Sequence, residues 1–121
     1  MIRILLADDN PEIRSALRLL LETRLDLELI EEARDMEHVL AQVEDSHPNL
    51  IILDWRLPGR PTSERVSVLR ALIPGLKVIA INTRPELHQQ VLAEGADAFI
   101  CKTDSPVKII ETIQQLCSNC D

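Results

Sequence analysis

The sequence contains few aromatic residues and few cysteines. Trp55 and Phe99 are its only Trp, Phe or Tyr residues, so the hydrophobic core has to be aliphatic. Three cysteines are an odd number and too few for a disulfide scaffold, which favours a reducing, cytoplasmic compartment. Nothing in these counts indicates a secreted protein.

Long apolar stretches and an excess of basic residues are also missing. No apolar run approaches the length that crosses a bilayer, and Asp8 and Asp9 follow the N-terminus too closely for a signal peptide. Thirteen Lys and Arg against 20 Asp and Glu give a net charge of −7. Because nucleic acids and anionic lipids are bound through Lys and Arg, we expect this segment to contact neither directly.

The sequence does contain a regular alternation of short apolar runs and amphipathic segments. Its 121 residues suit one domain with a real core, and we assign residues 1–118 to that domain and 119–121 to a tail or the start of a linker. Helix-start signals follow every apolar run, which predicts five helices and a parallel sheet covered on both faces. The predicted strands cover residues 2–7, 27–31, 49–53, 77–81 and 98–101.

Three aspartates directly follow two of these apolar runs. Asp8 and Asp9 come after the first run, and Asp54 comes after the third. Continuous apolar runs indicate strands buried on both faces, and open parallel sheets bind ligands at the carboxyl ends of such strands. Three carboxylates gathered there repel one another and favour a hard divalent cation such as Mg²⁺. The pattern therefore indicates metal-assisted chemistry on a phosphate.

Further polar residues follow the fourth and fifth strands, namely Asn82 with Thr83, and Lys102. All belong to the same edge of the predicted sheet. In a doubly wound sheet of order 2-1-3-4-5, strands one and three are neighbours and a crevice opens between them. We expect the three aspartates to line that crevice and Lys102 to approach it from strand five.

Three segments in this order resemble the receiver domain of bacterial two-component response regulators: Ala7–Asn10, Leu53–Gly59 and Glu94–Lys102. The resemblance covers nearly the whole chain. It implies an α/β fold of the flavodoxin-like, doubly wound type, with a five-stranded parallel sheet in the order 2-1-3-4-5 flanked by five helices.

The resemblance also implies a set of roles. Asp54 would be the phosphoacceptor, taking a phosphoryl group from a phosphohistidine. Mg²⁺, with Mn²⁺ as a substitute, would be held by Asp9, Asp54 and the backbone carbonyl of Arg56, and by Asp8 mostly through water. Lys102 would contact a phosphoryl oxygen. Such a domain is a phosphoacceptor with self-catalysed transfer and autodephosphorylation at most, not an enzyme with a separate substrate.

A conformational switch is the expected output. In the family, a Ser or Thr after strand four binds the phosphoryl group while an aromatic residue on strand five turns inward. Phe99 matches the aromatic position, but Asn82 stands at the hydroxyl position, with Thr83 one residue later. An Asn amide can donate to a phosphoryl oxygen. Trp55 adjoins Asp54 and is a natural reporter of the site.

The implied partners are a sensor histidine kinase or a phosphotransfer protein. A homodimer through the fourth helix, fifth strand and fifth helix is a further family expectation. Transcription regulation is one output, because many receivers precede a DNA-binding domain while others stand alone.

Other interpretations stay open. One alternative is a receiver-like interaction domain that works without phosphorylation. Two departures from the family pattern leave it open: Asn82 at the hydroxyl position, and Thr62 where the family usually has Gly. A phosphatase with an aspartyl-phosphate intermediate is disfavoured, because its second Asp is replaced by Arg56. Thr83 has the capping-box spacing from Glu86, so a plain N-cap is its simpler interpretation. Cys117 and Cys120 form a lone C-x-x-C pair, which is weak evidence for zinc or redox function.

Overall fold

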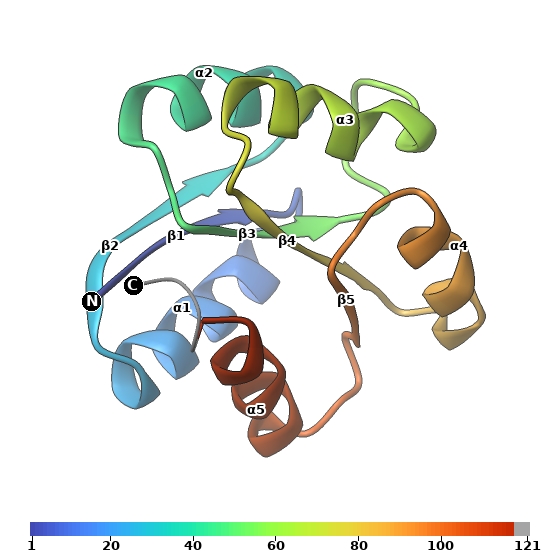
Figure 1. Cartoon of the computed structure of the whole chain (residues 1–121). Helices are drawn as coiled ribbons and strands as arrows, with labels where there is room; N and C mark the ends of the chain where they lie inside the picture. Colours follow the sequence, from blue (N-terminus) through green and yellow to red (C-terminus); the bar gives the residue numbers. More distant parts are fainter. Residues whose placement is uncertain (118–121) are drawn as a thin grey trace.

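A computed structural model describes residues 1–117 of the chain. Within them the elements alternate as the sequence predicts, and five parallel strands form one sheet in the order β2-β1-β3-β4-β5 (Figure 1). The elements are β1 (Ile2–Ala7), α1 (Pro11–Arg24), β2 (Leu27–Ala33), α2 (Met36–Ser46), β3 (Leu50–Asp54), α3 (Thr62–Leu72), β4 (Lys77–Asn82), the 3-10 turn η1 (Pro85–Leu87), α4 (His88–Ala93), β5 (Ala98–Cys101) and α5 (Pro106–Cys117).

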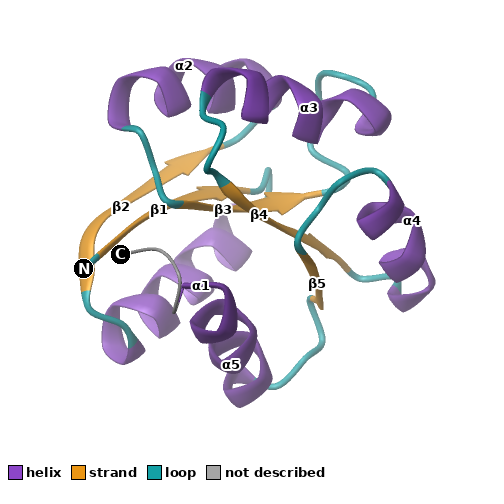
Figure 2. Cartoon of the chain, viewed as in Figure 1, coloured by secondary structure: helices purple, strands orange, loops and turns teal. Residues whose placement is uncertain are grey.

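Helices cover both faces of the sheet. α2 and α3 lie over one face and α1 and α5 over the other, with α4 beside β5 (Figure 2). Alternate strand residues feed two aliphatic cores. One contains Leu5, Leu53 and Val78 with residues of α2, α3 and α4, and the other contains Ile52 and Ile79 with residues of α1 and α5. Most residues of both cores are aliphatic, while Trp55 is buried within the first core and Phe99 packs against it.

Strand register brings the polar residues to one edge of the sheet. In the pairing of β1 with β3, Ala7 lies opposite Leu53, so the next residue of each strand is an aspartate. Asp54 in turn lies opposite Ile81 of β4. β2 occupies an edge of the sheet and is only partly buried.

The helix starts follow the sequence signals except at α3, which follows Pro61 without a side-chain cap, and at α4. The side chains of Asn10 and Asp35 cap α1 and α2 by accepting backbone amide hydrogen bonds. The predicted capping box at Thr83 is wrong: Arg84 precedes η1 without a side-chain cap, and its amide donates to Asn82 Oδ1 over 3.0 Å. The Asn82 side chain replaces the Thr83 hydroxyl as the group that turns the chain, because an Asn oxygen readily accepts the amide two residues on.

Across residues 1–117, no helix combines the length and apolar composition needed to cross a membrane. The C-x-x-C pair and the 119–121 tail fall outside the described residues, apart from Cys117, which is buried at the end of α5.

Candidate functional site

Asp8, Asp54 and Lys102 form a cluster of charges at the carboxyl ends of β1, β3 and β5. Lys102 Nζ lies 2.8 Å from Asp8 Oδ2 and 3.2 Å from Asp54 Oδ2. Asp8 and Asp54 are 1% and 3% exposed. A single, partly buried ammonium therefore bridges two buried carboxylates that would otherwise repel each other.

Asp9 lies beside this pair and is exposed. One carboxylate oxygen each from Asp8, Asp9 and Asp54 falls within 4.8 Å of the others. The set therefore offers two buried oxygen donors and one that faces solvent. Hard cations that take oxygen ligands and keep several waters fit such a donor set. The three aspartates can thus hold a divalent metal ion, as the sequence indicates.

Burial and charge shift the pKa values of the two bridged groups. Burial is the main cause that raises the pKa of Asp54, and the Asp8 carboxylate raises it further. The hydrogen bond from the Arg56 amide and the charge of Lys102 act in the opposite direction. Burial disfavours the charged form of Lys102, but the Asp8 and Asp54 carboxylates outweigh it and raise the Lys102 pKa. The site is thus short of positive charge, which is what a bound cation would supply.

The residues after Asp54 define the floor of the site. The backbone amide of Arg56 donates to Asp54 Oδ1 over 3.0 Å, while the Arg56 side chain is exposed. Trp55 is buried in the core beneath α2, α3 and α4, and its indole Nε1 donates to Glu94 Oε1 over 3.1 Å. Trp55 therefore adjoins the site without facing it.

Asn82 is buried at the carboxyl end of β4, 1% exposed. Its backbone carbonyl accepts the Lys102 amide over 2.8 Å, which ties β4 to the lysine. Its Nδ2 has no hydrogen-bond partner among the described residues. Thr83 is exposed, and its carbonyl accepts the Cys101 thiol. Of the two candidate phosphoryl contacts, only Asn82 combines burial with a donor that is still available.

Phe99 lies on β5 and is half-buried against the core that contains Leu53. Its ring stacks on the His88 imidazole of α4, with ring centroids 5.5 Å apart. The predicted switch aromatic thus contacts α4 directly.

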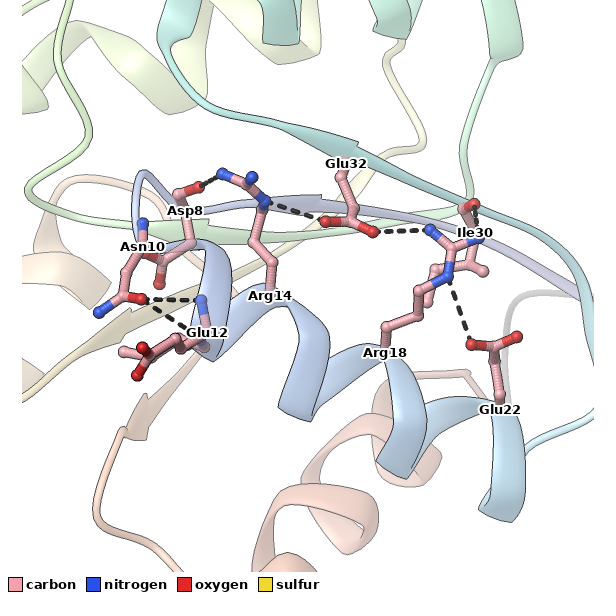
Figure 3. Close-up of polar contacts among 9 residues, drawn as sticks. Asp8, Asn10, Glu12, Arg14, Arg18, Glu22, Ile30 and Glu32 are labelled. Carbon is pink, nitrogen blue, oxygen red and sulfur yellow. Dashed lines mark hydrogen bonds and ion pairs between the residues drawn. The ribbon is translucent and has the colours of Figure 1, made fainter.

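Sequence reasoning missed the arginines that support the site. Arg14 and Arg18 extend from α1 towards Glu32 of β2, and Arg14 Nη1 also donates to the Asp8 carbonyl over 2.6 Å (Figure 3). The hydrogen bond from Arg18 is the main cause that lowers the Glu32 pKa. The spacing of four residues between the two arginines could have indicated that they share one helix face.

Arg65 on α3 was missed as well. It is 4% exposed, and its guanidinium donates to the backbone carbonyls of Asp54, Leu57 and Arg60. Burial lowers its pKa, while the nearby Asp54 and Glu94 carboxylates act in the opposite direction. No pattern in the sequence points to it, because an arginine in a helix is normally exposed.

Known proteins are similar to this chain in sequence. The sequence profile of the response regulator receiver domain matches residues 4–114. The chain is 35% identical to the transcriptional activator protein ExaE of Pseudomonas putida over 115 residues, which is 93% of this chain and 54% of that protein. It is 29% identical to the nitrate/nitrite response regulator protein NarL of Escherichia coli, covering 93% of this chain and 53% of the other.

A solved structure extends the likeness to the fold. The CheY-like response regulator receiver domain protein of Methanospirillum hungatei superposes with a TM-score of 0.82 at 28% identity, over 99% of this chain and 96% of that one. The chain spans about half the length of the curated relatives named above. With a family profile matching nearly the whole chain, the protein belongs to the response regulator receiver domain family, whose domains accept a phosphoryl group.

Proposed function

We propose that Asp54 accepts the phosphoryl group, from a phosphohistidine on a sensor histidine kinase or a phosphotransfer protein. The observation that carries the proposal is the bridge from Lys102 to both Asp8 and Asp54. In the transfer, an Asp54 carboxylate oxygen forms a P–O bond as the P–N bond to the histidine breaks. The imidazole leaves with the electron pair of that bond and takes up a proton.

Each neighbouring group has a separate task in this proposal. The Arg56 amide at Asp54 Oδ1 fixes the orientation of the carboxylate, which leaves Oδ2, the oxygen paired with Lys102, as the attacking atom. Once the phosphoryl group is attached, Lys102 pairs with one of its oxygens. Asn82 Nδ2 donates to another, which gives this buried amide the partner that the described residues do not provide. Thr83 is the alternative donor.

Mg²⁺ is the proposed cofactor, and Mn²⁺ a substitute. Asp9, Asp54 and the Arg56 carbonyl would hold the ion directly, and Asp8 mostly through water, since Mg²⁺ keeps several waters. Bound there, it would neutralise charge that builds on the phosphoryl oxygens during transfer.

The proposed output is a change at the face made by α4, β5 and α5. The Phe99 ring of β5 stacks on the His88 ring of α4. Movement of the Phe99 ring would therefore change a contact with α4. That face would contact an output domain, a partner protein or a second copy of the chain. The name of ExaE, a transcriptional activator protein, supports transcription regulation as the output. Residues 1–118 would be the receiver domain, acting in the cytoplasm.

The test is the intact mass of the protein after incubation with acetyl phosphate, with and without Mg²⁺, beside Asp54→Asn. We expect a phosphoryl adduct that depends on Mg²⁺ and is absent from the variant. Asp45→Asn, at an exposed position on α2, controls for the loss of a carboxylate elsewhere. No adduct in folded protein, together with no effect of Mg²⁺ on stability, would favour an interaction domain that works without phosphorylation.

A further inference from the structure

Arg65 enters the floor of the site from the first turns of α3. Its Nη1 donates to the carbonyl of Asp54 over 3.3 Å, its Nη2 donates to the Leu57 carbonyl, and its Nε donates to the Arg60 carbonyl over 3.0 Å. All three acceptors belong to one segment, residues 54–60. The planar guanidinium presents its donors in a rigid fork, so it fixes the two ends and the middle of this loop relative to one another.

The charge of Arg65 has no carboxylate at ion-pair distance among the described residues. Burying an unpaired cation costs free energy unless strong hydrogen bonds replace its hydration. A methionine would fill much of this space without that cost. The cost therefore points to a role in holding the carbonyls themselves.

The same loop is also hydrogen-bonded to α2. The Met36 amide donates to the Pro58 carbonyl over 2.9 Å. Gly59 has φ of +130°, and a Cβ there would lie 2.5 Å from the Met36 Cβ. The loop is thus clamped between α2 and Arg65, and Arg56 lies within the clamped stretch.

We propose that Arg65 is a positioning residue for the phosphorylation site, whose fork holds residues 54–60 so that the Arg56 carbonyl and the Asp54 carboxylate face the metal together. The inference rests on the proposed function, because it assumes that Arg56 supplies a carbonyl ligand. Groups that orient metal ligands typically change affinity by about 10–100-fold when they are removed.

Arg65→Lys separates this role from a simple effect of charge. Lysine keeps the positive charge but has no fork, so the field at the site changes little while the loop loses its fixed carbonyls. Arg70→Lys is the matched control. Arg70 lies on the same helix and its fork binds the Gly95 carbonyl and Asp97, which are remote from residues 54–60 in sequence.

Two measurements on the wild type and both variants test the proposal. The first is amide hydrogen exchange of residues 55–60 without metal, where we expect faster exchange in R65K alone. The second is Mg²⁺ titration followed by Trp55 fluorescence, where we expect R65K to bind about tenfold more weakly and R70K to bind as the wild type does. If R65K fails to fold, R65M takes its place. Losing a positive charge would by itself tighten cation binding, so weaker binding by R65M would be stronger support.

The outcomes separate the two proposals. If wild-type protein binds no Mg²⁺, the proposed function fails, and the exchange rates still decide whether Arg65 holds the loop. If the wild type binds Mg²⁺ and R65K matches it in both measurements, Arg65 has no positioning role. Equal weakening in R65K and R70K would assign the effect to general stability and would also overturn the proposal.

Discussion

Trp55 and Glu94 are joined by a hydrogen bond of 3.1 Å from the indole Nε1 to Oε1. Trp55 follows Asp54, and Glu94 is the C-cap residue of α4. Glu94 Oε2 also accepts the Thr62 hydroxyl over 3.3 Å. One carboxylate thus connects the residue after the proposed phosphoacceptor, the start of α3 and the end of α4. This bridge is separate from Asn82 and Phe99, so it offers a second physical connection between the site and α4.

Glu94→Ala should destabilise the domain by about 1–2 kcal/mol, because the buried indole N–H of Trp55 loses its acceptor. Urea unfolding followed by Trp55 fluorescence measures this loss. Thr62→Val removes only the hydroxyl contact and should cost less than half as much. Glu94→Gln keeps an acceptor and should lie between the wild type and Glu94→Ala. Equal stability of all four proteins would show that the bridge contributes nothing.

Stability should depend on pH through Asp54. Burial raises its folded-state pKa above the ordinary value of 3.8, so the folded protein binds a proton more readily than the unfolded chain, and Asp54 ionisation costs stability at neutral pH. The cost falls as the pH drops through the raised pKa and is gone below 3.8. Asp54→Asn should therefore be more stable than the wild type at neutral pH, by about 1 kcal/mol, and the difference should vanish in acid. The urea unfolding midpoints of both proteins, measured from neutral to acid pH, test the sign of this stability difference. A difference that grows towards acid would contradict the assignment.

Lys102→Met should destabilise the protein at neutral pH, because Asp8 and Asp54 lose the cation between them. Breaking a buried ion pair costs about 3–5 kcal/mol; with the lysine side chain 14% exposed, we expect about 2 kcal/mol. The control is Lys108→Met, whose exposed pair with Asp104 at 3.6 Å should contribute about 0.5 kcal/mol or less. Adding Asp54→Asn to Lys102→Met should recover part of the loss. If the two lysine substitutions lower stability equally, Lys102 does not stabilise the protein by bridging Asp8 and Asp54.

The placement of the aspartates could be predicted from the sequence because it follows from two physical rules, applied one after the other. Apolar runs without polar alternation indicate strands of a parallel sheet, and parallel strands end at the same edge. Asp8 and Asp54 therefore had to lie close together once β1 and β3 were neighbours, and Lys102 followed from β5 by the same argument. The positions of these three residues depend on strand order alone, and the sheet has the predicted order.

Features that depend on side-chain packing could not be predicted in this way. Arg65 is buried because the loop after β3 turns its carbonyls towards α3, and no local pattern encodes that turn. The capping box at Thr83 was wrong because Arg84, and not Thr83, is the residue before η1, and the Arg84 amide donates to Asn82 Oδ1. The spacing from Glu86 was present, but it does not show where the helical turn begins. That point is set here by the Asn82 side chain, which no local spacing rule takes into account.

Asn82→Ala should slow formation of the Mg²⁺-dependent adduct with acetyl phosphate. A hydrogen bond to a charged group contributes about 1.5–3 kcal/mol, so losing the Nδ2 donor should slow transfer by about tenfold or more. Asn82→Ser restores a short donor that can also accept the Arg84 amide, and should recover part of the rate. Thr83→Val tests the neighbouring hydroxyl, which is exposed, and should leave the rate unchanged. Time courses of intact mass decide between the two residues. If the adduct forms slowly in Thr83→Val and at the wild-type rate in Asn82→Ala, Thr83 and not Asn82 is the donor. If neither substitution changes the rate, Lys102 and the metal stabilise the phosphoryl oxygens without help from Asn82 or Thr83, and Asn82 acts only through its Oδ1, which accepts the Arg84 amide where the chain turns into η1.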